Sequence, residues 1–118
     1  MLPPQSIESL MLASQLVTLT EWIHQLQNLS KLQLRYTKLH QGAIEVVGKL
    51  PNLVILSMWW QSFNGEELVF KRESFGSLGL LELHWIKGVP FVRFGEGTMP
   101  KLELLGIYGW KELRKYVG

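Results

Sequence analysis

Two residue types are missing from this chain of 118 residues, cysteine and aspartate. Without cysteine, the chain cannot form a disulfide scaffold, a cysteine zinc site or a thiol nucleophile. All ten acidic residues are glutamate, which argues against a magnesium-dependent phosphoryl-transfer centre and against an aspartate-based catalytic site. The absence of cysteine also fits a reducing compartment.

The chain also lacks a strong charge of one sign and a long hydrophobic run. Its formal net charge is +2 and its basic residues are scattered, so nucleic acid is not indicated as a partner. No stretch approaches the roughly 18 apolar residues of a membrane span. Residues 1–5 carry no basic segment before an apolar core, and we therefore expect no secretion signal.

Leucine, by contrast, occupies 22 positions, and it recurs with a period. The template L-x-x-L-x-L, with positions 1, 4 and 6 apolar, matches five times, and successive matches begin 22, 24, 25 and 24 residues apart. The fifteen apolar positions are Ile7, Leu10, Leu12, Leu29, Leu32, Leu34, Leu53, Leu56, Met58, Leu78, Leu81, Leu83, Leu102, Leu105 and Ile107. This period is typical of leucine-rich repeats.

The repeat predicts one short parallel strand per coil, near residues 10–12, 32–34, 56–58, 81–83 and 105–107. Side chains alternate along a strand, so positions 4 and 6 point into the core and positions 3, 5 and 7 point to the concave face. Stacked coils bury the leucines that a single coil leaves exposed. We therefore predict a single α/β domain over residues 1–118, a leucine-rich-repeat solenoid of about five irregular coils, with short helices and loops on the convex face.

The segments between the predicted strands differ from one another. Residues 21–26 favour a short helical turn, and residues 41–49 favour a helix with one apolar face. Residues 62–74 are longer and more polar and contain an Asn-Gly turn. Residues 88–100 are rich in glycine and proline, which predicts an irregular loop with a short extended piece at 91–94.

No residue constellation predicts catalysis, a metal site or a cofactor. Gly42, Gly48 and Lys49 do not match a phosphate loop, because five residues separate the glycines and leucine follows the lysine. No second ligand lies at metal-compatible spacing from any of the three histidines, His24, His40 and His84. We therefore predict no catalytic residue, no cofactor and no enzyme activity.

Large and aromatic side chains gather just after the last leucine of each strand. Position 7 holds Arg35, Trp59, His84 and Tyr108. Position 8 holds Tyr36, Trp60 and Trp85. Position 7 faces outward by alternation, whereas position 8 lies where the strand bends, and its side chains are either exposed or part of the core. Because Trp, Tyr and Arg are enriched at binding hot spots, we predict that these seven residues form an interaction surface.

Five segments carry a resemblance to a known family, in the order Leu19-Thr20-Glu21-Trp22-Ile23, Leu26-Gln27-Asn28-Leu29, Gly48-Lys49-Leu50-Pro51-Asn52-Leu53, Phe63-Asn64-Gly65-Glu66-Glu67-Leu68 and Glu96-Gly97-Thr98-Met99-Pro100-Lys101-Leu102-Glu103. Together they resemble the C-terminal leucine-rich repeats of plant intracellular immune receptors. These are the coiled-coil, nucleotide-binding, leucine-rich-repeat disease-resistance proteins, of the cereal type. The resemblance covers essentially the whole chain.

The resemblance implies a cytoplasmic protein-interaction module with a protein partner. In that family the repeats recognise pathogen effectors or guarded host proteins, or they hold the receptor off by folding against its nucleotide-binding core. The chain contains neither a coiled-coil segment nor a nucleotide-binding module, so we expect a fragment of a receptor or the product of a short gene. Two alternatives remain, a truncated product without a role of its own and a leucine-rich-repeat scaffold unrelated to immunity.

Overall fold

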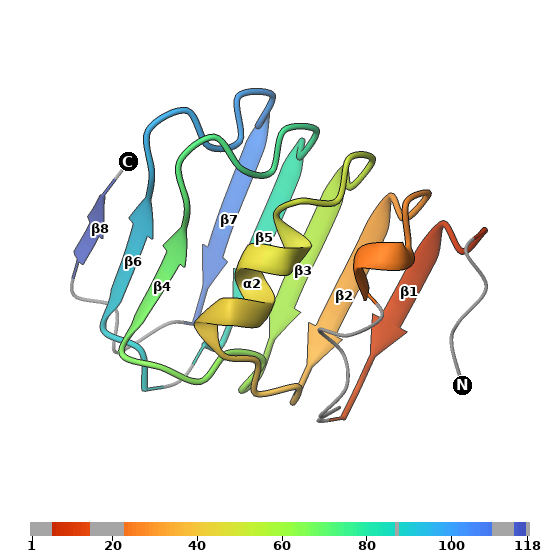
Figure 1. Cartoon of the computed structure of the whole chain (residues 1–118). Coiled ribbons are helices and arrows are strands. Elements are labelled where there is room, and N and C mark those ends of the chain that lie inside the picture. Colours follow the sequence, from red (N-terminus) through yellow and green to blue (C-terminus); the bar gives the residue numbers. More distant parts are fainter. Residues whose placement is uncertain (1–5, 15–22, 87, 110–114, 118) are drawn as a thin grey trace.

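The computed structural model describes residues 6–14, 23–86, 88–109 and 115–117. Its main element is a five-stranded parallel sheet with the strand order β1-β2-β3-β5-β7 (Figure 1). The five strands are β1 (Ser9–Leu12), β2 (Lys31–Arg35), β3 (Ile55–Trp59), β5 (Leu80–His84) and β7 (Leu104–Tyr108). Each of the five predicted strand positions therefore lies within a strand of this sheet.

The register of the sheet places equivalent repeat positions side by side. Leu32 pairs with Leu56, Leu56 with Leu81, and Leu81 with Leu105. The side chains of Leu32, Leu56 and Leu81 are fully buried, as are the position-6 residues of the same three strands, Leu34, Met58 and Leu83. The predicted leucine-rich-repeat solenoid is confirmed, with its core on one side of the five-stranded sheet.

Two short helices cover the inner face of this sheet, on the convex side of the molecule (Figure 1). The 3₁₀-helix η1 (Ile23–Gln25) lies within the predicted helical turn. Helix α2 (Gln41–Val47) corresponds to the helix predicted over residues 41–49, and it ends earlier because Gly48 is its C-cap. At its start, the ring nitrogen Nδ1 of His40 accepts a hydrogen bond from the backbone N–H of Gly42 at 3.1 Å, which caps a free N–H group of the first turn.

A second parallel sheet, which the sequence predicted only in part, lies on the same side as the helices. Its strands, in the order β4-β6-β8, are β4 (Glu67–Phe70), β6 (Phe91–Phe94) and β8 (Lys115–Val117). Strand β6 is the extended piece predicted at 91–94. Strand β4 corrects the interpretation of residues 62–74 as a polar turn region, because the four residues of β4 alternate and bury Leu68 and Phe70.

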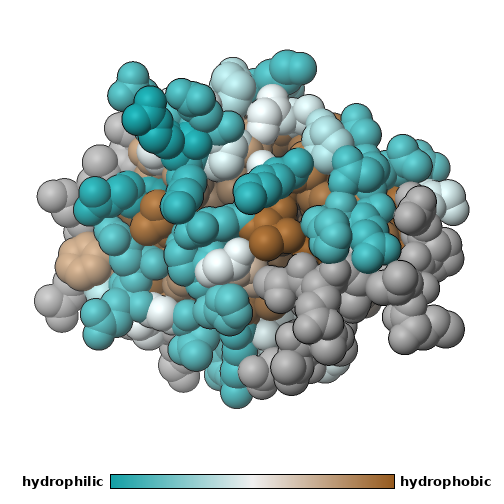
Figure 2. Space-filling view, in the orientation of Figure 1, coloured by the Kyte–Doolittle hydropathy of each residue, from teal (hydrophilic) through white to brown (hydrophobic). Residues whose placement is uncertain are grey.

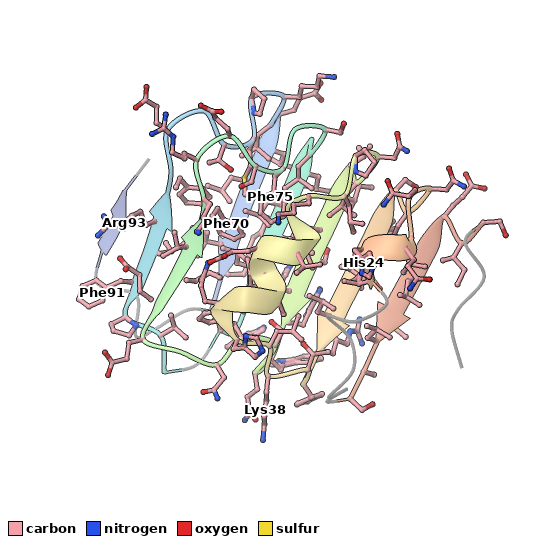
Figure 3. All side chains as sticks on the ribbon, in the orientation of Figure 1. His24, Lys38, Phe70, Phe75, Phe91 and Arg93 are labelled. Carbon is pink, nitrogen blue, oxygen red and sulfur yellow. The ribbon has the colours of Figure 1, made fainter. Side chains whose placement is uncertain are left out.

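Aromatic packing joins the second sheet to the core. The ring of Phe70 stacks on that of Phe94 with 5.2 Å between centroids. It also meets Phe75 edge-on at 5.4 Å. Figure 3 shows Phe70 and Phe75 close together beside α2. These contacts join β4 to β6 and to the segment that follows β4.

Helix α2 protects the free edge of β4 through one side chain. The Gln41 amide donates from Nε2 to the carbonyl oxygen of Val69 at 2.8 Å, and its Oε1 accepts from the N–H of Val69 at 3.0 Å. This pair of bonds imitates a neighbouring strand at an edge that otherwise presents unpaired backbone groups. The second sheet therefore has β4 as its edge strand, and Gln41 of α2 pairs with the backbone of that edge.

We expect Leu56→Ala and Leu81→Ala each to lower the free energy of unfolding by roughly 2–5 kcal/mol, because each truncation leaves a cavity in the leucine core. Chemical denaturation measures this loss. Leu104→Ala is the matched control: Leu104 is 58% exposed, and its truncation should change stability by less than about 0.5 kcal/mol. Equal effects at the three positions would contradict the observed register.

We expect Gln41→Ala to lower the free energy of unfolding by about 1–3 kcal/mol, because it leaves the Val69 N–H and C=O without their partners. Gln33→Ala makes the same chemical change on the outer face of β2 and should stay within about 0.5 kcal/mol of the parent chain. Urea denaturation of the three proteins checks this prediction. A Gln41→Ala variant as stable as Gln33→Ala would show that the edge of β4 needs no cover.

Candidate aromatic interaction surface

The outer face of the five-stranded sheet is the predicted concave face. It carries a continuous stack, the aromatic column, formed by Arg35, Trp59, His84 and Tyr108. The His84 ring lies between two rings, 3.7 Å from Trp59 and 4.6 Å from Tyr108 between centroids, and both pairs are nearly parallel. The Arg35 guanidinium carbon lies 5.2 Å from the Trp59 ring, within the range of a cation–π interaction. The register therefore brings four residues from four strands into one column.

The position-8 residues Tyr36, Trp60 and Trp85 form a second line, the rim row, at the carboxyl ends of the same strands. Tyr36 is 48% exposed and Trp85 is 47% exposed, while Trp60 is partly buried. Tyr36 stacks on Trp60 at 5.8 Å between centroids, and Trp60 meets Trp59 of the aromatic column at 5.3 Å. Of the two orientations that the sequence left open for position 8, Tyr36 and Trp85 have the exposed one, whereas Trp60 lies between the two.

Two glycines in the last described coil make room for rings of these two lines. A Cβ atom added to Gly106 would lie 2.5 Å from the Tyr108 ring, and one added to Gly109 would lie 2.5 Å from the Trp85 ring. Both rings thus lie against glycine backbone. Neither glycine was predicted as part of the surface, although Gly106 occupies position 5, which alternation assigns to this face.

Polar groups occupy the middle of the outer face. The Ser57 hydroxyl donates a hydrogen bond to Glu82 Oε1 at 2.8 Å, and Glu82 Oε2 lies 3.7 Å from His84 Nε2. A nucleophilic triad needs the histidine between serine and carboxylate, so that the base reaches the hydroxyl. Here the carboxylate lies between the two, so these three residues do not have the order of a nucleophilic triad. The sequence analysis did not include Ser57 and Glu82 in the interaction surface, although both occupy position 5, which alternation assigns to the outer face.

The part of the chain that the structure describes offers no cluster of three or more metal-binding side chains. It has no helix long and apolar enough to cross a membrane. Two open hollows lie away from the outer face. One, of about 490 Å³, is lined by Glu45, Lys71 and their neighbours, and these two residues already form an ion pair at 3.3 Å. The other, of about 580 Å³, is lined by residues 94–99 together with Leu102 and Leu105.

With the parallel coils and the leucine core established, comparison with known proteins decides the family. A family model described as "Leucine-rich repeat region" matches residues 1–116. The chain belongs to the leucine-rich-repeat region family. No solved structure matches this leucine-rich-repeat chain.

The leucine-rich-repeat region is also similar to a curated plant protein, "Disease resistance protein RPM1" of Arabidopsis thaliana. The two are 37% identical over 100 residues, which cover 85% of this chain and 11% of the relative. The chain thus spans about a tenth of the length of the relative. The predicted resemblance to the leucine-rich repeats of plant disease-resistance proteins is confirmed.

We expect Trp59 and His84 to stabilise each other. A double-mutant cycle of Trp59→Ala and His84→Ala should give a coupling free energy of about 0.5–1.5 kcal/mol, the range for stacked rings beyond their burial. Denaturation of the two single variants and the double variant measures it. A second cycle that pairs Trp59→Ala with His40→Ala, on the convex side, should be additive within about 0.5 kcal/mol. Equal coupling in both cycles would contradict the stack.

Proposed function

We propose that the chain is the protein-interaction module of a plant intracellular immune receptor. It binds its protein partner through the outer face of the five-stranded sheet. The aromatic column and the rim row support this proposal, since they join Trp, Tyr and Arg side chains into one surface of the kind found at binding hot spots. The similarity to a disease-resistance protein supports the immune role.

The convex side and the outer face of the five-stranded sheet differ in the kind of side chain that they expose. Figure 2 views the convex side, which carries α2, and hydrophilic residues cover most of it. The outer face instead exposes Tyr36, Trp85, Leu104 and Tyr108. Exposed large apolar residues that gather on one face are a feature of protein-interaction sites.

Binding in this proposal is surface complementarity without a chemical step. Stacking holds the rings of the aromatic column in place before the partner arrives, so that association loses little side-chain entropy. The strands provide a rigid support, because each is hydrogen-bonded to its neighbours along its length. The non-enzymatic role agrees with the order of Ser57, Glu82 and His84, which is not that of a nucleophilic triad.

Two kinds of protein partner follow from the receptor proposal. One is a pathogen effector or the host protein that the receptor guards. The other is the receptor's own nucleotide-binding core, which the repeats would hold inactive in the cytoplasm. A leucine-rich-repeat scaffold unrelated to immunity would bind neither kind of partner.

The test is binding of the purified chain to two sets of purified proteins, nucleotide-binding domains of plant disease-resistance receptors and effectors of a pathogen of the source plant. We expect Tyr108→Ala to weaken binding by about tenfold or more, the effect of removing a hot-spot ring, with little change in melting temperature. Trp59→Ala should lose both binding and stability, because Trp59 is partly buried between Arg35 and His84.

Phe91→Ala is the matched control for Tyr108→Ala. Phe91 is an exposed aromatic residue on β6 of the second sheet (Figure 3), and its loss should leave binding unchanged. The reverse result, with binding lost in Phe91→Ala and kept in Tyr108→Ala, would move the working surface to the convex segments around residues 62–74 and 88–100.

A further inference from the structure

The rim row has an unusual backbone. Its three residues have positive φ angles of 56° for Tyr36, 22° for Trp60 and 57° for Trp85. Bulky L-residues rarely adopt this region, because their Cβ atom crowds the neighbouring backbone. The same position in the next coil is Gly109, with φ of 63°, and glycine adopts this conformation freely.

Hydrogen bonds between coils accompany this conformation. The N–H of Tyr36 donates to the carbonyl oxygen of Trp60 at 2.8 Å, and the N–H of Trp85 donates to that of Tyr108 at 2.8 Å. These bonds join backbone groups, so they form whichever side chain occupies the position. The backbone pairing at this position therefore does not select an aromatic ring.

Positive φ angles also occur in three exposed polar residues, Lys38, Gln61 and Glu73, and in two large apolar residues of the core. Phe75 and Met99 have φ angles of 55° and 50°, but both side chains are buried in the core. Burial of these two side chains stabilises the fold and offsets the free-energy cost of the positive φ. Tyr36 and Trp85 leave about half of their surface in water, so the same explanation fails for them. Strained residues of this kind gather at binding sites.

We propose that the rim row anchors an acidic segment of the partner protein, one that carries apolar or aromatic side chains beside its carboxylates. This inference rests on the proposed function and names the chemistry of its partner. The exposed rings of Tyr36 and Trp85 receive the apolar side chains, and the neighbouring cations receive the carboxylates.

The charges beside the rim row select an acidic partner. The described residues that follow the last leucine of each central strand, 35–38, 59–62 and 84–86, include the cations Arg35 and Lys38 and no acidic side chain. Lys38 is exposed and extends beyond the strand ends in Figure 3. Glu82, the nearest carboxylate along these strands, accepts the Ser57 hydroxyl and faces His84.

Single-stranded nucleic acid also binds aromatic rows, but it needs a cationic groove that follows the phosphates. Here the described residues beside the rim row include two cations, Arg35 and Lys38. Two cations are too few to follow a phosphate backbone. A protein segment with a few carboxylates fits this surface better than a polyanion does.

The experiment starts from a random peptide library displayed on phage and selected on the immobilised chain. We expect the selected peptides to combine Asp or Glu with Trp, Tyr, Phe or Leu. Synthetic versions with Asn and Gln in place of the acids should bind the chain about tenfold more weakly, the size of effect expected for a charge-assisted contact. A selection that enriches no acidic sequence, or an oligo-dT that displaces the peptides at equal concentration, would overturn the proposal.

Two variants at one position separate binding from stability. Trp85→Gly and Trp85→Ala remove the same ring, but only glycine relieves the positive φ, so Trp85→Gly should melt at a higher temperature than Trp85→Ala. Both should bind the selected acidic peptides about tenfold or more weakly, and to an equal extent. A binding loss that followed the melting temperatures would contradict a direct contact by the ring.

Gln61→Gly is the control. Gln61 is exposed and has φ of 53°, so its replacement by glycine should raise the melting temperature and leave peptide binding unchanged. If Tyr108→Ala abolishes binding of receptor or effector proteins while Trp85→Gly and Tyr36→Gly do not, the outer face remains the binding surface and the anchoring role of the rim row is wrong.

Discussion

The in-register pairing of the parallel strands is the constraint on which the rest of the structure depends. Side chains alternate between the two faces of a strand, so a slip of one residue would expose every leucine of that strand. Burial of Leu32, Leu56 and Leu81 in one line excludes such a slip. Once the leucines point inward, position 7 must point outward on every strand, and the aromatic column follows from the core.

The convex side adapts to this sheet and differs from coil to coil. Between β2 and β3 the chain forms α2, whereas between β3 and β5 and between β5 and β7 it forms β4 and β6. These two kinds of cover meet at one side chain, because the Gln41 amide bonds both backbone groups of Val69. Helix α2 thus covers the edge of β4 that has no neighbouring strand in the described part of the chain.

The leucine period is sufficient to predict the strands, the buried positions and the aromatic column, because side chains alternate between the two faces of each strand. Three features were not predictable in this way. Strand β4 is four residues long within a polar segment, too short for its alternation to stand out. The positive φ of Tyr36 and Trp85 goes against the conformational preference of bulky residues. The packing of the Tyr108 ring on Gly106 and of the Trp85 ring on Gly109 depends on side-chain conformations, which the leucine period does not specify.

Proton NMR of the histidine rings tests the register most directly. The chain has three histidines, and His24 and His40 are exposed, whereas the His84 ring lies between Trp59 and Tyr108. Ring currents should shift the His84 proton signals upfield of the other two sets, and Trp59→Leu should return them part of the way. His84→Gln assigns the signals by removing them. Three histidines with the shifts of a free imidazole would contradict the stacked column and the register that builds it.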